Sequence, residues 1–228
     1  MKLRKAVIAI GCAAALSCAA VLIGPAPASA VATLRVSDGI NPAITVFDGG
    51  PGDLCPAAGC VTAFTTIGVW TINVSTGLSS SPFPHMDLNS IDVSTGAGNL
   101  TILLGDTDFT QGPGTHPVSL TSAIGGTTNG TVQWHSGLND SNLNPATAGC
   151  CDQVGTLYGP LGSGAFSQTN GDLYSADGTF ALALEVTIHH TGAGATSFDY
   201  EGKVPEPATL LLMGFGLLTV GALRRRNG

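Results

Sequence analysis

The chain has 228 residues and a formal net charge of −7, and its few charged residues are unevenly distributed. Six of the eight basic residues lie at the two extreme ends, so residues 31–203 hold 14 acidic residues against only Arg35 and Lys203. This acidic segment excludes charge-driven binding to nucleic acid or to an anionic membrane surface. Its length, roughly 170 residues, is enough for one domain with a substantial core.

The first 30 residues have the three parts of a secretory signal peptide. A basic start precedes an uncharged apolar stretch over 6–23, and small residues that include Ala28 and Ala30 follow. This pattern predicts export, with cleavage after Ala30. An alternative is a lipobox that ends at Cys18, although Ala15 stands where a lipobox usually has leucine.

Residues 31–203 read as short strands separated by turns. The clearest pattern covers 180–190, where Phe, Leu, Leu, Val and Ile alternate with smaller or polar residues. Weaker candidate strands cover 43–47, 70–74, 100–104, 118–120 and 132–134. No stretch has a convincing helical period. The segment therefore predicts an all-β domain, an antiparallel β-sandwich of the jelly-roll type.

Four cysteines remain after the signal peptide, at Cys55, Cys60, Cys150 and Cys151. An even number in an exported chain indicates two disulfides. A Cys55–Cys60 bond would close the loop 49–60, but it would leave a vicinal pair that needs an awkward backbone. We therefore expect Cys150 and Cys151 each to pair with one of the two earlier cysteines. Zinc is an alternative on residue type, but the spacing matches no common ligand arrangement.

Asp106 and Asp108 are the strongest candidates for metal ligands. They stand two apart in a turn, where side-chain oxygens can share a calcium ion, and the loop 140–144 offers a similar set of oxygens. Ordinary Asx turns are the interpretation that we favour for both, with calcium as the alternative. We expect no other cofactor.

The sequence predicts no catalytic residues. It contains no Gly-x-Ser-x-Gly motif and no histidine metal motif. His189 and His190 are neighbours on a predicted strand, so their side chains should point to opposite faces. We expect both to be surface or capping residues.

The last 25 residues, 204–228, have three parts. In chain order these are a motif at Val204, Pro205, Glu206 and Pro207, an uncharged apolar run over 208–223, and a basic cluster at Arg224, Arg225 and Arg226. The run would make a helix of about 24 Å, whereas the hydrocarbon core of a bilayer is about 30 Å thick. The arginines should stay on the cytoplasmic side and leave the preceding chain outside.

These parts, in this order, closely resemble the PEP-CTERM sorting signal of Gram-negative bacteria. The resemblance implies recognition by exosortase, a membrane-embedded cysteine protease, and removal of the tail after it has held the protein at the inner membrane. It also implies a host that exports exopolysaccharide and a final place on the cell surface or in the biofilm matrix. The alternative is an ordinary single-span tail anchor.

Two function classes follow for the 31–203 domain. The first is a non-catalytic surface or matrix protein, and the second is a carbohydrate-binding module for the cell's own exopolysaccharide. A secreted hydrolase is less favoured than either. The aromatic candidates for a sugar site are Trp70, Trp134, Tyr158, Tyr174 and Tyr200. Exposure of Tyr158 and Tyr174 beside aspartates would favour sugar binding, and burial of all five would favour the first class.

Overall fold

The computed structural model describes residues 31–80 and 84–204. In this part of the chain the elements are β1 (Thr33–Ser37), β2 (Ile44–Phe47), β3 (Cys60–Ile67), β4 (Trp70–Ser80), β5 (His85–Ser94), β6 (Gly98–Thr128), β7 (Thr131–Asn139), α2 (Pro145–Ala148), β8 (Gln153–Val154), β9 (Tyr158–Leu161), β10 (Gly164–His190) and β11 (Gly194–Lys203).

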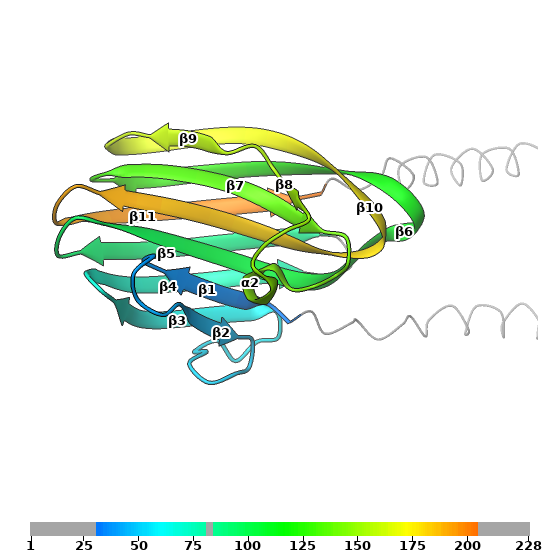
Figure 1. Cartoon of the computed structure of the whole chain (residues 1–228), viewed down its shortest axis with the longest axis horizontal. Helices are drawn as coiled ribbons and strands as arrows, with labels where there is room; N and C mark the ends of the chain where they lie inside the picture. Colours follow the sequence, from blue (N-terminus) through cyan, green and yellow to red (C-terminus); the bar gives the residue numbers. More distant parts are fainter. Residues whose placement is uncertain (1–30, 81–83, 205–228) are drawn as a thin grey trace, which may run out of the picture.

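The strands form one hydrogen-bonded sheet, shown in Figure 1. Its order is β3-β4-β5-β11-β6-β10-β7-β8, with β1 also paired to β6, β2 to β1 and β9 to β7. Every pairing is antiparallel. The all-β, antiparallel prediction is therefore confirmed. The jelly-roll arrangement is not confirmed by this strand order and stays a prediction.

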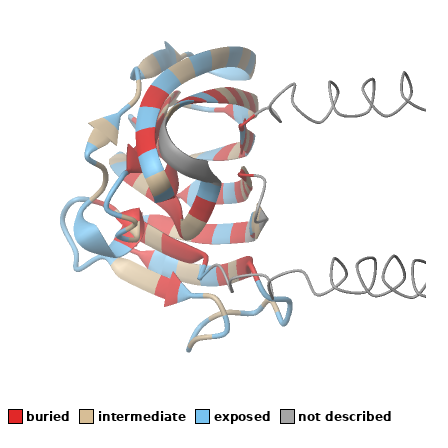
Figure 2. Cartoon of the chain, turned by 90° about the vertical axis from the view of Figure 1, so that its right-hand side faces the viewer, coloured by how far each residue is buried: buried red, intermediate tan, exposed pale blue. Residues whose placement is uncertain are grey.

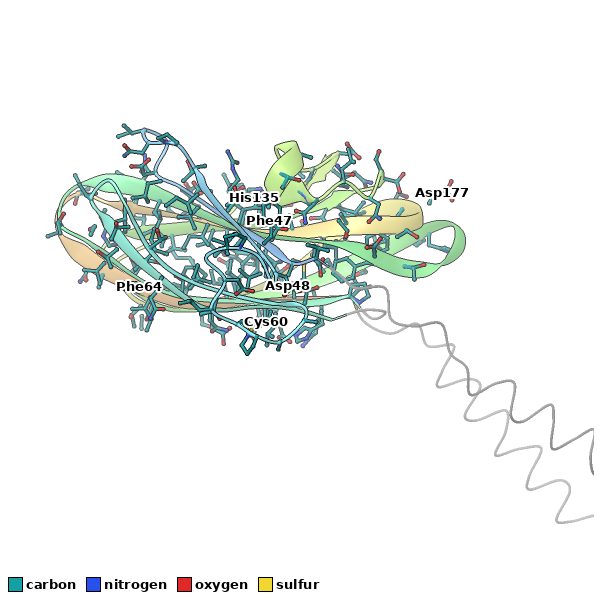
Figure 3. The ribbon with its side chains drawn as sticks, turned by 90° about the horizontal axis from the view of Figure 1, so that it is seen from below. Phe47, Asp48, Cys60, Phe64, His135 and Asp177 are labelled. Atoms are coloured by element: carbon teal, nitrogen blue, oxygen red, sulfur yellow. A yellow bond between two sulfur atoms is a disulfide. The ribbon has the colours of Figure 1, made fainter. Side chains whose placement is uncertain are left out.

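Two long strands, β6 and β10, fold this sheet into two layers. They pair along most of their length, and the register is irregular between Asp177 and Thr179, where Gly178 has φ +92°. The first layer holds β1, β2, β7, β8, β9, the first half of β6 and the second half of β10. The second layer holds β3, β4, β5, β11 and the remaining halves. Figure 3 shows side chains packed between the layers.

The inner faces of the two layers form one apolar core, which Figure 2 colours as buried. The expected apolar face of β10 is buried at Phe180, Leu182, Leu184, Val186 and Ile188. Between the layers, the rings of Trp134 and Tyr200 meet edge to face, with centroids 5.1 Å apart. The period-two prediction for 180–190 is therefore confirmed for the inner face.

The short helix α2 was not expected from the sequence. The Asn144 side chain caps it by accepting from Ala146 N at 3.0 Å, and Gly149 ends it with φ +87°. Asn before Pro145 and Gly at the end are ordinary helix start and stop signals. The helix packs on Gly105, where a Cβ atom would lie 2.9 Å from Asn144 Oδ1.

The chain leaves the domain directly after β11. Val204 is packed at 7% exposure, and its N–H donates to Pro84 O at 2.9 Å. Within the described ranges, no helix has the length and hydropathy needed to span a membrane. The predicted signal peptide, with Ala28 and Ala30, lies outside the described residues. So does the predicted sorting tail from Pro205 through Arg224, Arg225 and Arg226.

Candidate functional site

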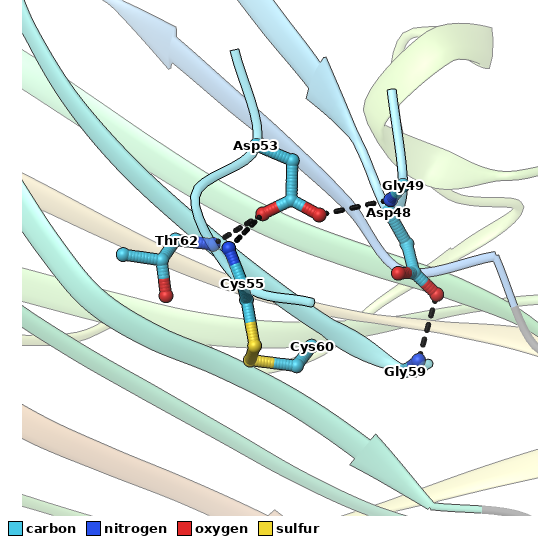
Figure 4. The surroundings of a disulfide bond; sticks show 7 residues. All are labelled: Asp48, Gly49, Asp53, Cys55, Gly59, Cys60 and Thr62. Carbon is cyan, nitrogen blue, oxygen red and sulfur yellow. Dashed lines mark hydrogen bonds between the residues drawn. A yellow bond between two sulfur atoms is a disulfide. The ribbon is translucent and has the colours of Figure 1, made fainter. Parts of the chain in front are cut away.

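The first candidate site is a disulfide loop between β2 and β3 (Figure 4). Cys55 and Cys60 are bonded to each other with a Cα–Cα distance of 5.8 Å. The expected cross-pairing with Cys150 and Cys151 is therefore wrong, and those two cysteines are free thiols. The physical reason is the placement of the segments, because residues 150–151 lie against β7 in the first layer.

Two aspartates fasten this loop through backbone N–H groups, as Figure 4 shows. Asp53 accepts from the N–H groups of Gly49, Cys55 and Thr62 at 2.8–2.9 Å. Burial pushes the pKa of Asp53 upward, but these donors outweigh it and hold the pKa below its ordinary value. Asp48 accepts from the N–H of Gly59 at 2.7 Å. The disulfide and these hydrogen bonds together give the loop a structural role.

The second candidate site is on the outer face of the first layer. His135 of β7 and Glu185 of β10 are direct cross-strand partners. Cys150 follows α2 in the chain and lies beside His135 and Glu185. The ligating atoms of His135, Cys150 and Glu185 all lie within 4.8 Å of one another, and all three residues are half-buried. We call these three residues the His135 cluster. Cys151 lies at its edge, packed against Gly137.

The groups of the His135 cluster change one another's ionisation. The Cys151 thiol hydrogen-bonds to Cys150 and, with His135, holds the pKa of Cys150 well below its ordinary value, although burial opposes this. The bond to Cys150 also raises the pKa of His135. The pKa of Glu185 is raised, mainly by burial, and the positive charges of His135 and Arg35 oppose this rise. The cluster is thus a coupled group of thiol, imidazole and carboxyl.

The sequence prediction overlooked this cluster. His135 and Glu185 are 50 positions apart, and only the pairing of β7 with β10 brings them together. One signal was available, because Glu185 is the only charged residue in the otherwise apolar and small stretch 180–186.

Asp106 and Asp108 occupy different surroundings. Asp106 is fully buried, and burial raises its pKa to about 6. Asp108 exchanges two hydrogen bonds with Asn142, from its N–H to Asn142 Oδ1 and from Asn142 Nδ2 to its Oδ1, both at 2.8 Å. The structure therefore brings Asp108 together with the 140–144 loop, although the Asn142 amide nitrogen, and not its oxygen, faces the Asp108 carboxylate. Calcium binding there stays a prediction.

The adjacent histidines point to opposite faces, as expected. His189 is exposed and bonds Asn99, whereas His190 is 1% exposed. His190 Nδ1 lies 2.7 Å from Ser94 Oγ, and Nε2 lies 2.8 Å from Thr196 Oγ1. The expectation of a surface position is wrong for His190, whose hydrogen bonds join three strands inside the core. Burial lowers the pKa of His190 and favours the neutral ring.

Most of the candidate sugar-binding aromatics are core residues. Trp70, Trp134, Tyr174 and Tyr200 are at most 5% exposed. Tyr158 is half-buried, and its hydroxyl lies 3.2 Å from Asp172 Oδ1. Separately, an open hollow of about 370 Å³ lies over β5, β6 and β11 in the second layer. Its lining includes Asn89, Ile91, Ser197 and Asp199.

Comparison with solved structures gives distant similarities. The K1 cleaved adhesin domain of Lys-gingipain from Porphyromonas gingivalis W83 is 10% identical and has a TM-score of 0.34, with coverage of 65% of this chain and 92% of that domain. The C-terminal CBM6 of the laminarinase LamC from Zobellia galactanivorans is 9% identical, with a TM-score of 0.26 and coverage of 50% and 80%. At these TM-scores the similarities carry no argument about function.

Comparison in sequence is decisive only for the tail. No curated protein matches the chain. The PEP-CTERM protein-sorting motif matches residues 203–226, from the last residue of β11 through the arginine cluster. That motif implies export, membrane-anchored sorting in the Gram-negative cell envelope and exosortase as the processing partner. The chain is therefore a β-rich protein that carries a PEP-CTERM sorting motif.

Proposed function

We propose that this chain is an exported, non-catalytic protein of the cell surface or biofilm matrix, which exosortase processes at its C-terminal tail. The observation that carries the proposal is the position of the motif, which begins where β11 ends. Val204 is still packed and hydrogen-bonded, so the described domain extends to the residue before Pro205. Cleavage on the C-terminal side of Val204 would release the β domain without removing any part of its sheet.

The composition of the tail supports removal over permanent anchoring. The apolar run 208–223 contains Gly214, Gly216 and Gly221 and is short for a span. Pro205 and Pro207 disfavour helix at the motif, and an extended segment fits a protease cleft. The three arginines hold the end of the tail on the cytoplasmic side.

The test is mass spectrometry of the protein from the surface fraction of cells that make exopolysaccharide. Replacing Pro205, Glu206 and Pro207 with alanine should leave an uncleaved form bound to the inner membrane. Replacing the three arginines should misplace the protein. A matched control replaces three exposed residues of β10 with alanine, Ser167, Thr169 and Ser175, and should be processed normally. Recovery of peptides from 210–224 in the wild-type surface fraction would contradict the proposal.

The proposal that the domain is not a serine hydrolase rests on the surroundings of the Ser94–His190 pair. Ser94 and His190 are in contact, as a hydrolase would require, but they are 2% and 1% exposed. The second nitrogen of His190 bonds a threonine and no carboxylate. A substrate could not reach this pair without opening the core.

Carbohydrate binding is the second candidate. The hollow in the second layer offers the amide of Asn89 and the carboxylate of Asp199 beside exposed Ile91. The half-exposed aromatic Tyr158 belongs to the first layer and does not line this hollow. Titration with the cell's own exopolysaccharide tests the idea, because binding that Asn89→Ala and Asp199→Ala abolish would place the sugar in the hollow.

A weak calcium site at Asp106, Asp108 and the 140–144 loop also remains a proposal, supported by the proximity of Asp108 to that loop. Calcium at 100 times its dissociation constant would stabilise the fold by about 2.7 kcal/mol. Equal melting temperatures in chelator and in millimolar calcium would leave only the turn interpretation.

A further inference from the structure

The outer face of the first layer has a floor of very small residues. Gly105 of β6, Ala183 of β10 and Gly137 of β7 are in register across three neighbouring strands. The backbone of α2 lies against Gly105, and the Cys151 side chain lies against Gly137. A Cβ atom at Gly137 would come within 2.9 Å of Cys151 Cβ. The segment 144–151 can therefore lie flat on the sheet.

The next row of the sheet carries chemically active side chains. Leu103, Glu185 and His135 are in register on the same three strands, with Arg35 of β1 paired to Leu103. Glu185 and His135 stand side by side, directly next to the small-residue floor. They are held by strands at the centre of the layer, so their Cα positions are fixed by the ladder hydrogen bonds.

The backbone after α2 turns Cys150 toward this pair. Gly149 and Cys150 both have φ +87°, the left-handed region, which is unusual for a cysteine. The Cys150 N–H donates to Pro145 O at 3.0 Å and closes the turn. A non-glycine residue held in this region is often found at a functional site, where the surrounding structure maintains it.

We propose that His135, Cys150 and Glu185 form a binding site for one thiophilic divalent cation, for which Zn²⁺ is the natural probe. The three ligating atoms lie within 4.8 Å of one another, so a small inward movement of the side chains would place a cation among them. Zinc takes bonds of about 2.0–2.3 Å to nitrogen, oxygen and sulfur, and tetrahedral sites often combine three protein ligands with one open position. The proposal stands apart from the sorting function.

The ligand set selects among metals. One thiolate and one imidazole favour zinc over calcium or magnesium, which prefer oxygen ligands. The acidic composition of residues 31–203 also attracts cations to the surface of the domain. Arg35 lies in the same row and offers Glu185 a competing positive partner. A bound cation would replace that partner.

The test uses the full chain, isolated with its thiols reduced and freed of metal by a chelator. Zn²⁺ is titrated against a chromophoric chelator, and Co²⁺ replaces it for absorption spectroscopy. We expect one metal ion per chain and a thiolate-to-cobalt charge-transfer band. Zn²⁺ should also protect Cys150 from alkylation, which peptide mass spectrometry measures.

Three variants should weaken binding. Removal of a ligand in Cys150→Ser or His135→Ala should cost more than the roughly 10–100-fold that the loss of an outer partner costs. Gly137→Ala should also weaken binding, because it displaces Cys151 and the turn beside it. The matched control is His189→Ala, an exposed histidine of β10 four positions from Glu185, which should bind as the wild type does. Unfolding curves of each variant report whether it folds.

Three results would overturn the proposal. The first is the absence of zinc binding at micromolar metal by folded wild-type protein with both thiols free. The second is unchanged affinity in folded Cys150→Ser. The third is a Cys150–Cys151 disulfide in protein taken directly from the envelope, because an oxidised pair cannot ligate the metal through a thiolate.

Discussion

Replacing Asp92 with asparagine should remove a pH-dependent loss of stability from this fold. Asp92 lies on the inner face of β5 and is 0% exposed. Its Oδ1 accepts from Ser90 Oγ at 2.7 Å, and its Oδ2 has no hydrogen-bond partner in the described structure. Burial raises the pKa of this carboxyl group to about 7, with the Ser90 bond opposing the rise. The folded protein therefore holds the Asp92 proton more tightly than the unfolded chain does.

The direction of the effect follows from that difference. Below the unfolded pKa of 3.8, Asp92 is protonated in both states and contributes no penalty. As the pH rises toward 7, the unfolded chain loses the proton first, so the free energy of unfolding falls. A pKa difference of about 3, at about 1.36 kcal/mol per pKa unit, corresponds to a loss of about 4 kcal/mol above pH 7. Asp106 should contribute in the same direction, since its pKa is also raised.

The assay is urea unfolding at pH 5 and pH 8 for wild type and Asp92→Asn. Asparagine is neutral at both values, so the variant should lose much less stability between them, and at pH 8 it should be more stable than the wild type. The control Asp177→Asn, at an exposed carboxyl group, should follow the wild-type curve. Equal losses in wild type and Asp92→Asn would refute the idea that Asp92 is buried with a raised pKa.

Further predictions concern the disulfide and the packing between strands. Replacing Cys55 and Cys60 with alanine opens a loop of only a few residues and should lower the free energy of unfolding by about 2 kcal/mol in urea; an unchanged value would mean that the loop closes without the bond. Gly126→Ala should destabilise more than Gly202→Ala, because its Cβ would meet the backbone oxygen of Ser197, whereas that of Gly202 would meet only a flexible leucine end. Melting temperatures compare the two, and the reverse order would contradict this packing.

The alternation of apolar and polar residues was sufficient to predict the strand faces. On β10 the apolar side chains from Phe180 to Ile188 face the core with a period of two, although Ala181 and Ala183 on the opposite face are buried as well. The same logic failed for β6. Residues 100–104 and 118–120 were expected as separate strands, with the first ending before Gly105-Asp106. In the structure β6 is one bent strand, because β10 pairs with it on both sides of the bend.

The two candidate sites depend on where distant segments lie in the fold, which the local sequence does not contain. Cys55 pairs with Cys60 inside its own loop, whereas Cys151 packs against Gly137 of β7, after the helix α2 that lies on Gly105. His135 meets Glu185 because β7 pairs with β10 in one particular register. A shift of that register by one residue would point one of the two side chains into the core. Only the sheet order and register reveal such a cluster.

The central position of β11 has a consequence for how the domain is assembled during export. β11 is the last strand of the described residues, yet it lies between β5 and β6. A chain that crosses the membrane N-terminus first presents β5 and β6 as unpaired edges until residues 194–203 arrive, and such edges invite aggregation. Distant pairings of this kind also form slowly. The sorting motif begins at residue 203, so the strand that closes this gap ends where the motif starts, and both edges stay open until almost the whole domain has been exported.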